Sequence, residues 1–161
     1  MDPGLRPGAV ELDGTTGAVI RASHTLTGPG SEWIWAAPGW DIAATELQWI
    51  FPRRPGARGG TARPQDILKL AFRAGFTLAC IPAARSLALL PQEWRADVGG
   101  PGLTKEQVQK KIAGNLTALE RVLFQAIPAA RHGDVLDAIG IGRAAMRLAK
   151  TTTKHDWSLT K

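Results

Sequence analysis

The first third of the chain has an apolar and polar pattern typical of β-structure. Two short apolar runs, residues 8–12 and 18–22, flank a turn-rich segment at residues 13–17. Short apolar runs separated by Gly, Asp and Thr are typical of a β-hairpin. A stretch rich in Gly, Pro and Trp follows at residues 28–40 and is expected to form a loop.

The next segments alternate between strand-like and helix-like patterns. Residues 42–49 are mostly apolar and are predicted to form a strand. Pro64 suits the first position of a helix, Gly75 suits the residue just after its end, and apolar residues repeat at helical spacing between them. Residues 76–81 are predicted to be a short buried strand. This order of strand, helix and strand indicates α/β layering.

The C-terminal half is predicted to be helical after a loop at residues 90–103, which contains two prolines and several glycines. Thr104 with Gln107 three residues later forms a capping-box pattern, which predicts a helix start. The apolar stripe of that helix comprises Val108, Ile112, Leu116, Leu119 and Leu123. A final helix is expected over residues 134–149.

Composition and charge narrow the class of protein. The 161 residues, 44% of them hydrophobic, fit one domain over residues 1–150 with a polar tail over 151–161. The net charge of +6 suits a polyanionic partner. The single cysteine, Cys80, excludes a disulfide framework, favours a reducing compartment and is expected to be buried. No run approaches the ~18 apolar residues of a membrane span, and no signal peptide is visible, so we expect a cytoplasmic protein without a membrane partner.

Three acidic residues are candidates for a metal site. Asp134 and Asp137 are three residues apart at the start of the last predicted helix, so their side chains lie near one face. Two such carboxylates repel unless a cation lies between them, and Mg²⁺ prefers oxygen ligands. The alternative is that they stabilise the helix N-terminus. Glu46 lies in an apolar segment, where a buried carboxylate needs a partner or a metal, unless it faces outward from an edge strand.

Four segments resemble, in order along the chain, the motifs of the RuvC-type Holliday junction resolvases. Residues 2–8 resemble the opening Asp-Pro-Gly motif of that family, and residues 44–46 resemble its Val-Glu strand motif. Residues 91–99, followed by 105–108, resemble the segment that carries its basic residues. Residues 132–138 resemble its closing Asp-x-x-Asp helix. The patterns look closer to phage-type members than to the main bacterial form.

The resemblance implies an α/β protein with the RNase H-like fold, in which helices flank a mixed central β-sheet. That family has an apolar strand before its first Asp, and only Met1 precedes it here, so a truncated first strand is expected. The implied cofactor is Mg²⁺, with Mn²⁺ as a substitute, and two such ions about 4 Å apart can activate water and stabilise the leaving oxygen. The implied metal ligands are Asp2, Glu46, Asp134 and Asp137, and Lys105 joins them as a catalytic, phosphate-contacting residue.

The resemblance also implies a homodimer that binds branched DNA. The predicted DNA-binding residues are Arg6, Trp49, Phe51, Arg53, Arg54, Arg95, Lys105, Lys110 and Lys111. His132 is a candidate for handling protons or phosphate. The alternatives are a core position for Trp49, a strand-end cap for Phe51, a solvated face for Lys110 and Lys111, and a structural role for His132. The loop tryptophans Trp33, Trp35 and Trp40 suit packing or a dimer contact, or else a DNA platform.

Together these patterns predict a crossover junction endodeoxyribonuclease. It would resolve four-way junctions by metal-dependent phosphodiester hydrolysis, in DNA recombination and repair or in phage DNA processing, in the cytoplasm of a bacterial or phage-infected cell. The alternatives are a nuclease that acts more broadly on branched or flap DNA, a catalytically impaired junction-binding protein, and an unrelated basic adaptor.

Overall fold

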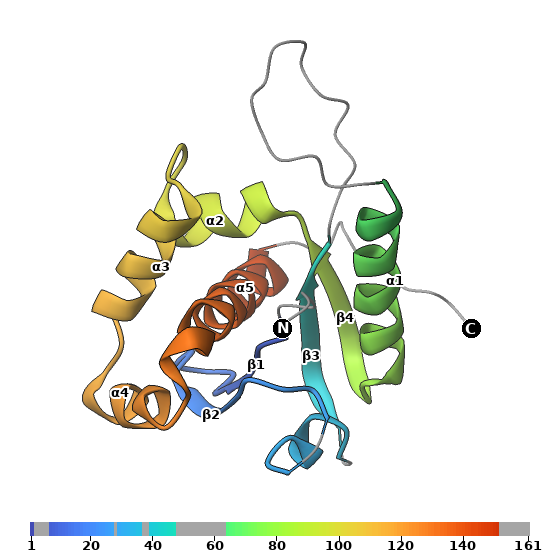
Figure 1. Ribbon diagram of the computed structural model, residues 1–161, viewed down its shortest axis with the longest axis horizontal. Coiled ribbons are helices and arrows are strands. Elements are labelled where there is room, and N and C mark those ends of the chain that lie inside the picture. Colours follow the sequence, from blue (N-terminus) through green and yellow to red (C-terminus); the bar gives the residue numbers. More distant parts are fainter. Residues whose placement is uncertain (2–6, 28, 37–38, 48–63, 152–161) are drawn as a thin grey trace.

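The computed structural model describes residues 1, 7–27, 29–36, 39–47 and 64–151. Within this part the chain is mixed α/β, which confirms the predicted α/β class (Figure 1). The elements, in order, are β1 (Ala9–Leu12), β2 (Val19–Ser23), a 3₁₀ helix (Glu32–Ile34), β3 (Trp40–Glu46), α1 (Pro64–Cys80), β4 (Ala83–Leu89), α2 (Pro91–Gly99), α3 (Lys105–Gly114), α4 (Ala118–Gln125), a second 3₁₀ helix (Ala129–Arg131) and α5 (His132–Thr151).

The described strands form two separate two-stranded sheets. The hairpin prediction is confirmed, because β1 and β2 pair antiparallel from Ala9 opposite Ser23 onward. Strands β3 and β4 pair parallel, from Trp40 opposite Ala83 to Glu46 opposite Leu89. No ladder joins the two sheets within the described ranges. The described strands therefore do not form the single central sheet that was expected.

Helix α5 is the centre of the molecule. It packs against β1 and β3 on one side and against α2 and α3 on the other, while α1 covers the opposite face of the β3–β4 sheet (Figure 1). The larger apolar cluster surrounds α5 and includes the fully buried Trp94, Val108 and Ile139. A smaller cluster around Ile34, Ala43 and Ile81 is separate from it.

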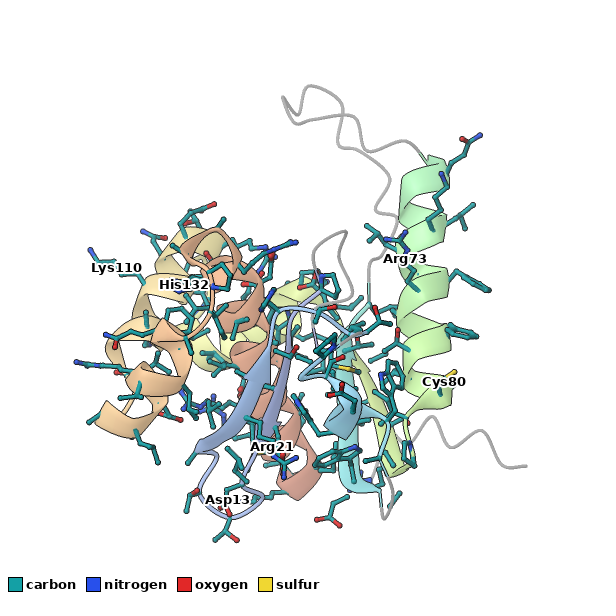
Figure 2. All side chains as sticks on the ribbon, turned by 60° about the horizontal axis from the view of Figure 1, so that its bottom comes forward. Asp13, Arg21, Arg73, Cys80, Lys110 and His132 are labelled. Atoms are coloured by element: carbon teal, nitrogen blue, oxygen red, sulfur yellow. The ribbon has the colours of Figure 1, made fainter. Side chains whose placement is uncertain are left out.

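The predictions for α1 and the strand after it are wrong. The helix continues through Gly75 to Cys80, and Phe76 is 61% exposed. Cys80 is exposed at the end of α1 instead of buried (Figure 2). A glycine lowers helix stability without ending the helix, and a short apolar run does not by itself distinguish helix from strand. The strand is β4, which starts after Pro82.

Two further segments differ from the expected pattern. Residues 90–103, predicted as a loop, contain helix α2, because Pro91 occupies the first helical position, where no N–H donor is needed. Near residues 28–40, the expected loop contains a 3₁₀ helix, and Trp40 already belongs to β3. Glu46 is the last residue of β3 and does not lie inside a longer strand. Leu47 follows the strand, and residues 48 and 49 of the predicted strand lie outside the described residues.

The helical C-terminal half matches the prediction only in part. Thr104 and Gln107 form the predicted capping box at the start of α3. The single apolar stripe is interrupted, because Thr117 and Glu120 form a second capping box that starts α4, and Leu119 is 70% exposed. The predicted final helix is confirmed as α5. Residues 152–161 of the predicted tail lie outside the described residues.

Among the described helices, none is both long enough and apolar enough to cross a membrane.

Candidate functional site

Glu46 is a buried carboxylate at the carboxyl end of β3. Its side chain is 6% exposed, and its Oε2 atom accepts a hydrogen bond of 2.7 Å from the indole Nε1 of Trp94. The guanidinium of Arg95 lies 3.9 Å from the same oxygen. Helix α2 begins two residues after β4 ends, and β4 is the parallel neighbour of β3. The fold therefore brings two consecutive α2 side chains to Glu46.

Asp137 is a second buried carboxylate, in the second turn of α5. It is only 2% exposed, and Gln109 Nε2 donates to its Oδ1 atom at 2.8 Å. Lys105 Nζ lies 2.5 Å from its Oδ2 atom. Lys105 and Gln109 are one turn apart on α3, so they present both donors from one face of that helix. The predicted basic residue Lys105 thus lies directly beside a predicted metal ligand.

Asp134 lies one turn before Asp137 and is only partly buried. Arg131 Nη1 is 3.9 Å from its carboxylate. The backbone of Gly8 packs against the carbonyl of Asp134 so closely that a Cβ atom there would collide with it. At the other end of this N-terminal stretch, the Met1 carbonyl accepts a hydrogen bond of 3.3 Å from the backbone N–H of Glu46. Met1 and Gly8 therefore lie against the two elements that carry the acids.

Trp94 connects the Glu46 end of the sheet to α5. A Cβ atom on Gly140 would lie only 2.7 Å from the Trp94 ring, so the indole packs directly on the glycine backbone. Gly140 follows Asp137 by three residues and shares its face of the helix. The ring that donates to Glu46 is thus fixed against α5 within one turn of Asp137.

Basic side chains accompany the acids at this end of the molecule. Arg95 also lies over the Trp94 ring, with its Cζ atom 5.3 Å from the ring centroid. The pKa of Glu106 is lowered by its own backbone N–H and the Thr104 hydroxyl, and the charges of Lys105 and Arg95 lower it further. The charges of Lys105 and Arg95 therefore both act on the Glu106 carboxylate. Lys105 thus pairs with Asp137, and Arg95 lies beside Glu46.

The chemistry of these acids suits a hard divalent cation, which prefers carboxylate oxygens. However, no three His, Cys, Asp or Glu side chains in the described part of the chain converge tightly enough to hold one metal ion. The carboxylates of Glu46, Asp134 and Asp137 each lie within 4 Å of a Lys or Arg nitrogen instead. Asp2, the fourth predicted ligand, lies outside the described residues, so the four-carboxylate site stays a prediction.

Several predicted DNA-binding residues also lie outside the described residues, namely Arg6, Trp49, Phe51, Arg53 and Arg54. Lys110 is exposed on α3 and points away from the body of the protein (Figure 2). Lys111 donates to the Gly99 carbonyl at 2.9 Å, so it joins α3 to the end of α2. Among the predicted basic residues in the described part of the chain, Arg95 and Lys105 each lie within 4 Å of a predicted metal ligand.

His132 has structural partners at the start of α5 (Figure 2). Its Nε2 atom lies 2.8 Å from the Ile127 carbonyl, to which it donates in the matching tautomer. Its ring centroid is 4.0 Å from that of Phe124. These contacts favour the structural alternative for His132, and its proton-handling role stays a prediction.

The loop tryptophans pack within their own segment. Trp33 and Trp40 meet edge to face at 6.1 Å between centroids. The indole nitrogens of Trp33, Trp35 and Trp40 donate to the carbonyls of Gly30, Leu26 and Ile34. These bonds favour the packing alternative over a stacking platform for DNA.

Three residues that shape the site and its support are not among the predicted site residues. Two of them, Trp94 and Gln109, donate hydrogen bonds to the buried carboxylates of Glu46 and Asp137. Glu120 is 2% exposed and joins α4 to β2 and α5. The Thr-x-x-Glu spacing at Thr117 could have identified Glu120 as a helix-capping residue. No sequence signal indicates that Trp94 and Gln109 face the acids, since those contacts depend on how the helices pack.

Comparisons of the chain with protein-family models, curated proteins and solved structures gave no significant match.

Proposed function

We propose that this protein is a divalent-metal-dependent DNA endonuclease with an RNase H-like fold that resolves four-way junctions. The observation that carries the proposal is the pair of buried carboxylates, Glu46 and Asp137, at one end of the fold. Each is oriented by a neutral side-chain donor, and each lies beside a basic residue. Burial of two acids next to partly exposed cations is costly without a use, and clustered acids and bases are typical of catalytic sites.

The metal ligands in this proposal are Asp2, Glu46, Asp134 and Asp137, as the family resemblance implies. Bound Mg²⁺ or Mn²⁺ would supply the charge that activates water and stabilises the leaving oxygen. Trp94 and Gln109 hold the Glu46 and Asp137 carboxylates in fixed orientations through bonds that do not require Lys105 or Arg95. Lys105 compensates the charge of Asp137 in the absence of another cation.

Lys105 is the residue best suited to exchange partners. Its side chain is 43% exposed, so it can rotate from Asp137 to a DNA phosphate when another positive charge compensates the acid. Arg95 adds a planar guanidinium that suits a phosphate group. The net charge of +6 provides general attraction to DNA. Arg6, Trp49, Phe51, Arg53, Arg54, Lys110 and Lys111 remain proposed DNA contacts, and a homodimer with two sites suits a junction of near two-fold symmetry.

The test is cleavage of a labelled four-way junction by the full chain and by Asp134→Asn in Mg²⁺. The variant is expected to bind the junction with unchanged affinity and to lose cleavage. Asp97→Asn is the matched control, because Asp97 forms an ion pair with Arg147 away from these acids and should cleave normally. Full cleavage by Asp134→Asn would refute the proposal. Equal cleavage of flap and linear DNA would instead identify the broader nuclease.

A second candidate function is junction binding without catalysis. The observation that favours it is that Glu46, Asp134 and Asp137 each lie beside a Lys or Arg, without a three-acid cluster in the described ranges. Isothermal titration of Mn²⁺ into the free protein separates the two functions. Binding that Asp137→Asn abolishes supports the nuclease, and junction affinity without any Mn²⁺ binding supports the binding module.

A further inference from the structure

The outer face of α1 carries large apolar side chains that the rest of the described chain does not cover. Leu68, Phe72 and Phe76 are 60%, 73% and 61% exposed. They are four residues apart, so they form one row along the helix, which we name the α1 row. The row lies at an edge of the molecule (Figure 1). Single exposed apolar side chains are common, whereas contiguous ones mark interaction sites.

The α1 row forms a ridge with a gap beside it. The rings of Phe72 and Phe76 stack, with centroids 6.2 Å apart and planes 18° from parallel. Gly75 lies on the same exposed side, and a Cβ atom there would have no neighbour within 4 Å in the described part of the chain. Side chains four residues apart on a second helix form a ridge that packs into such a gap. The relief of this face therefore suits a helix.

Two cations border the α1 row on the side opposite Gly75. Lys69 and Arg73 each follow a member of the row by one residue, whereas Gly75 precedes one, so they flank the row on opposite sides. Both cations are exposed, and among the described residues neither forms an ion pair (Figure 2 shows Arg73). Acidic groups on a partner would complement these charges and fix its orientation.

A second copy of the chain complements this face less well. In an antiparallel pair of α1 helices about a two-fold axis, the same flank of each helix meets, so Lys69 and Arg73 would face their own copies. In a parallel pair they would face the uncharged Gly75 side. Neither arrangement supplies an acidic group, so the proposed homodimer would use another face. An anionic membrane supplies negative charge but has no ridge to fill the gap at Gly75.

We propose that the outer face of α1 docks an acidic amphipathic helix of another protein. An apolar row of that helix would lie on the α1 row, and its carboxylates would lie opposite Lys69 and Arg73. The two phenylalanines supply the large apolar contact area that dominates the energetics of interfaces. The proposal does not depend on nuclease activity, because α1 lies on the opposite face of the β3–β4 sheet from α5 (Figure 1).

The test uses Cys80, the only cysteine of the chain, as an attachment point. It is exposed at the end of α1, about 6 Å along the helix axis from Phe76. A synthetic helical peptide of about 18 residues carries a terminal cysteine in a disulfide with 2-mercaptoethanol. The Cys80 thiolate attacks this disulfide, joins the peptide and releases 2-mercaptoethanol. At a fixed 2-mercaptoethanol concentration, the joined fraction measures how well the peptide docks on α1.

Two peptides are compared on the full chain. The acidic peptide has Leu residues four apart and Glu along one flank, and the matched peptide has Lys in place of each Glu. The acidic peptide is expected to join with an equilibrium constant at least about tenfold larger than that of the matched peptide. Lys69→Glu combined with Arg73→Glu should reverse this preference.

Single variants locate the docking surface on α1. Phe72→Ser should lower capture of the acidic peptide about tenfold. Gly75→Gln should also lower it while leaving the fold at least as stable, because Gln is a better helix former than Gly and its side chain has open space in the free protein. Leu119→Ser removes a similarly exposed apolar side chain from α4, so it is the matched control and should join the acidic peptide normally.

Equal capture of the two peptides, or a preference that the charge reversal leaves unchanged, would overturn the proposal. Sedimentation of the chain alone tests the second copy, since a dimer that Phe72→Ser dissociates would assign the α1 row to self-association. Vesicles that contain phosphatidylglycerol test the lipid surface. Vesicle binding that Phe72→Ser removes, without a preference for the acidic peptide, would assign this face to a membrane and would also overturn the proposal.

Discussion

Asp137 and Glu120 are equally buried carboxylates with different kinds of partners. Each is 2% exposed. Glu120 accepts hydrogen bonds from the backbone N–H groups of Val19 and Thr117, both at 2.8 Å, and from Arg143 at 2.7 Å. The partners of Asp137 in the described ranges are the long side chains of Gln109 and Lys105. Exposure alone therefore does not separate a structural acid from a candidate functional one.

The difference lies in whether the partners can leave. Backbone donors at Glu120 belong to β2 and to the start of α4, so they cannot move away without opening the fold. Lys105 can rotate away from Asp137 while α3 stays in place, because its side chain is partly exposed. A carboxylate whose counter-charge can be exchanged suits binding of another cation, whereas a carboxylate enclosed by fixed donors suits stability.

The largest expected effect comes from Asp137→Asn. The amide keeps the size of the side chain but lacks the charge proposed to hold a metal. We expect the single-turnover rate of junction cleavage to fall about a thousandfold, equivalent to about 4 kcal/mol of activation free energy. The thermal unfolding midpoint should change little. A large loss of stability with normal cleavage would place Asp137 in the same structural class as Glu120.

Glu120→Ala should have the opposite profile. It leaves Arg143 without its buried partner and two backbone donors without an acceptor, so we expect a loss of about 3 kcal/mol in the free energy of unfolding. Chemical denaturation measures this loss. Cleavage per folded molecule should remain that of the unmodified chain. A selective loss of cleavage in the folded variant would show that Glu120 also supports the site.

Trp94→Phe in combination with Glu46→Gln measures how firmly the indole holds its carboxylate. The phenyl ring removes the Nε1 donor from a fully buried position. A double-mutant cycle of unfolding free energies should give a coupling of about 1 to 2 kcal/mol between the two positions. Additive effects would mean that Trp94 contributes only packing, and Glu46 would then lack the fixed orientation inferred for it.

The smallest effect is a pH dependence of stability that belongs to Glu120. Burial alone would raise its pKa, but hydrogen bonds from Thr117 and Val19 and the charge of Arg143 outweigh burial and lower the pKa below its ordinary value of 4.5. Its stabilising contribution is therefore complete above pH 4.5 and is lost as the pH falls through the lowered pKa of the folded state. Thermal melts from neutral to acid pH should show a shallower decline for Glu120→Gln. Parallel curves would contradict this assignment.

Local signals along the sequence were reliable where one short segment decides the structure. The hairpin turn, the capping box at Thr104 and the last helix depend on neighbouring residues, and the structure confirms all three. The prediction was wrong where the same residue type is common in two kinds of structure, as Gly is inside and after helices and Pro is in loops and at helix starts. Gly75 suits the end of a helix but lies inside α1, and Pro91 is typical of a loop but begins α2.

The candidate site was predictable only as a set of residue types. The acids and Lys105 were identified from motifs, and two of them, Glu46 and Asp137, are indeed buried. Their partners were not predictable, because Trp94 reaches Glu46 across 48 residues and Gln109 reaches Asp137 across 28. Such contacts depend on how α2 and α3 pack on α5, which no periodic pattern in one helix determines.

Gly140 shows how a residue without any functional group can limit the variation that the site tolerates. A Cβ atom at this position would lie 2.7 Å from the Trp94 ring and 2.9 Å from Ile112 Cδ1, both in the core. One methyl group would thus move α5 away from α2 and shift Asp137 relative to Glu46. In a saturation library selected for activity, position 140 should therefore accept fewer amino acids than the partly exposed Asp134. A geneticist who mapped that library would find one of its most intolerant positions at a residue that takes no part in the chemistry.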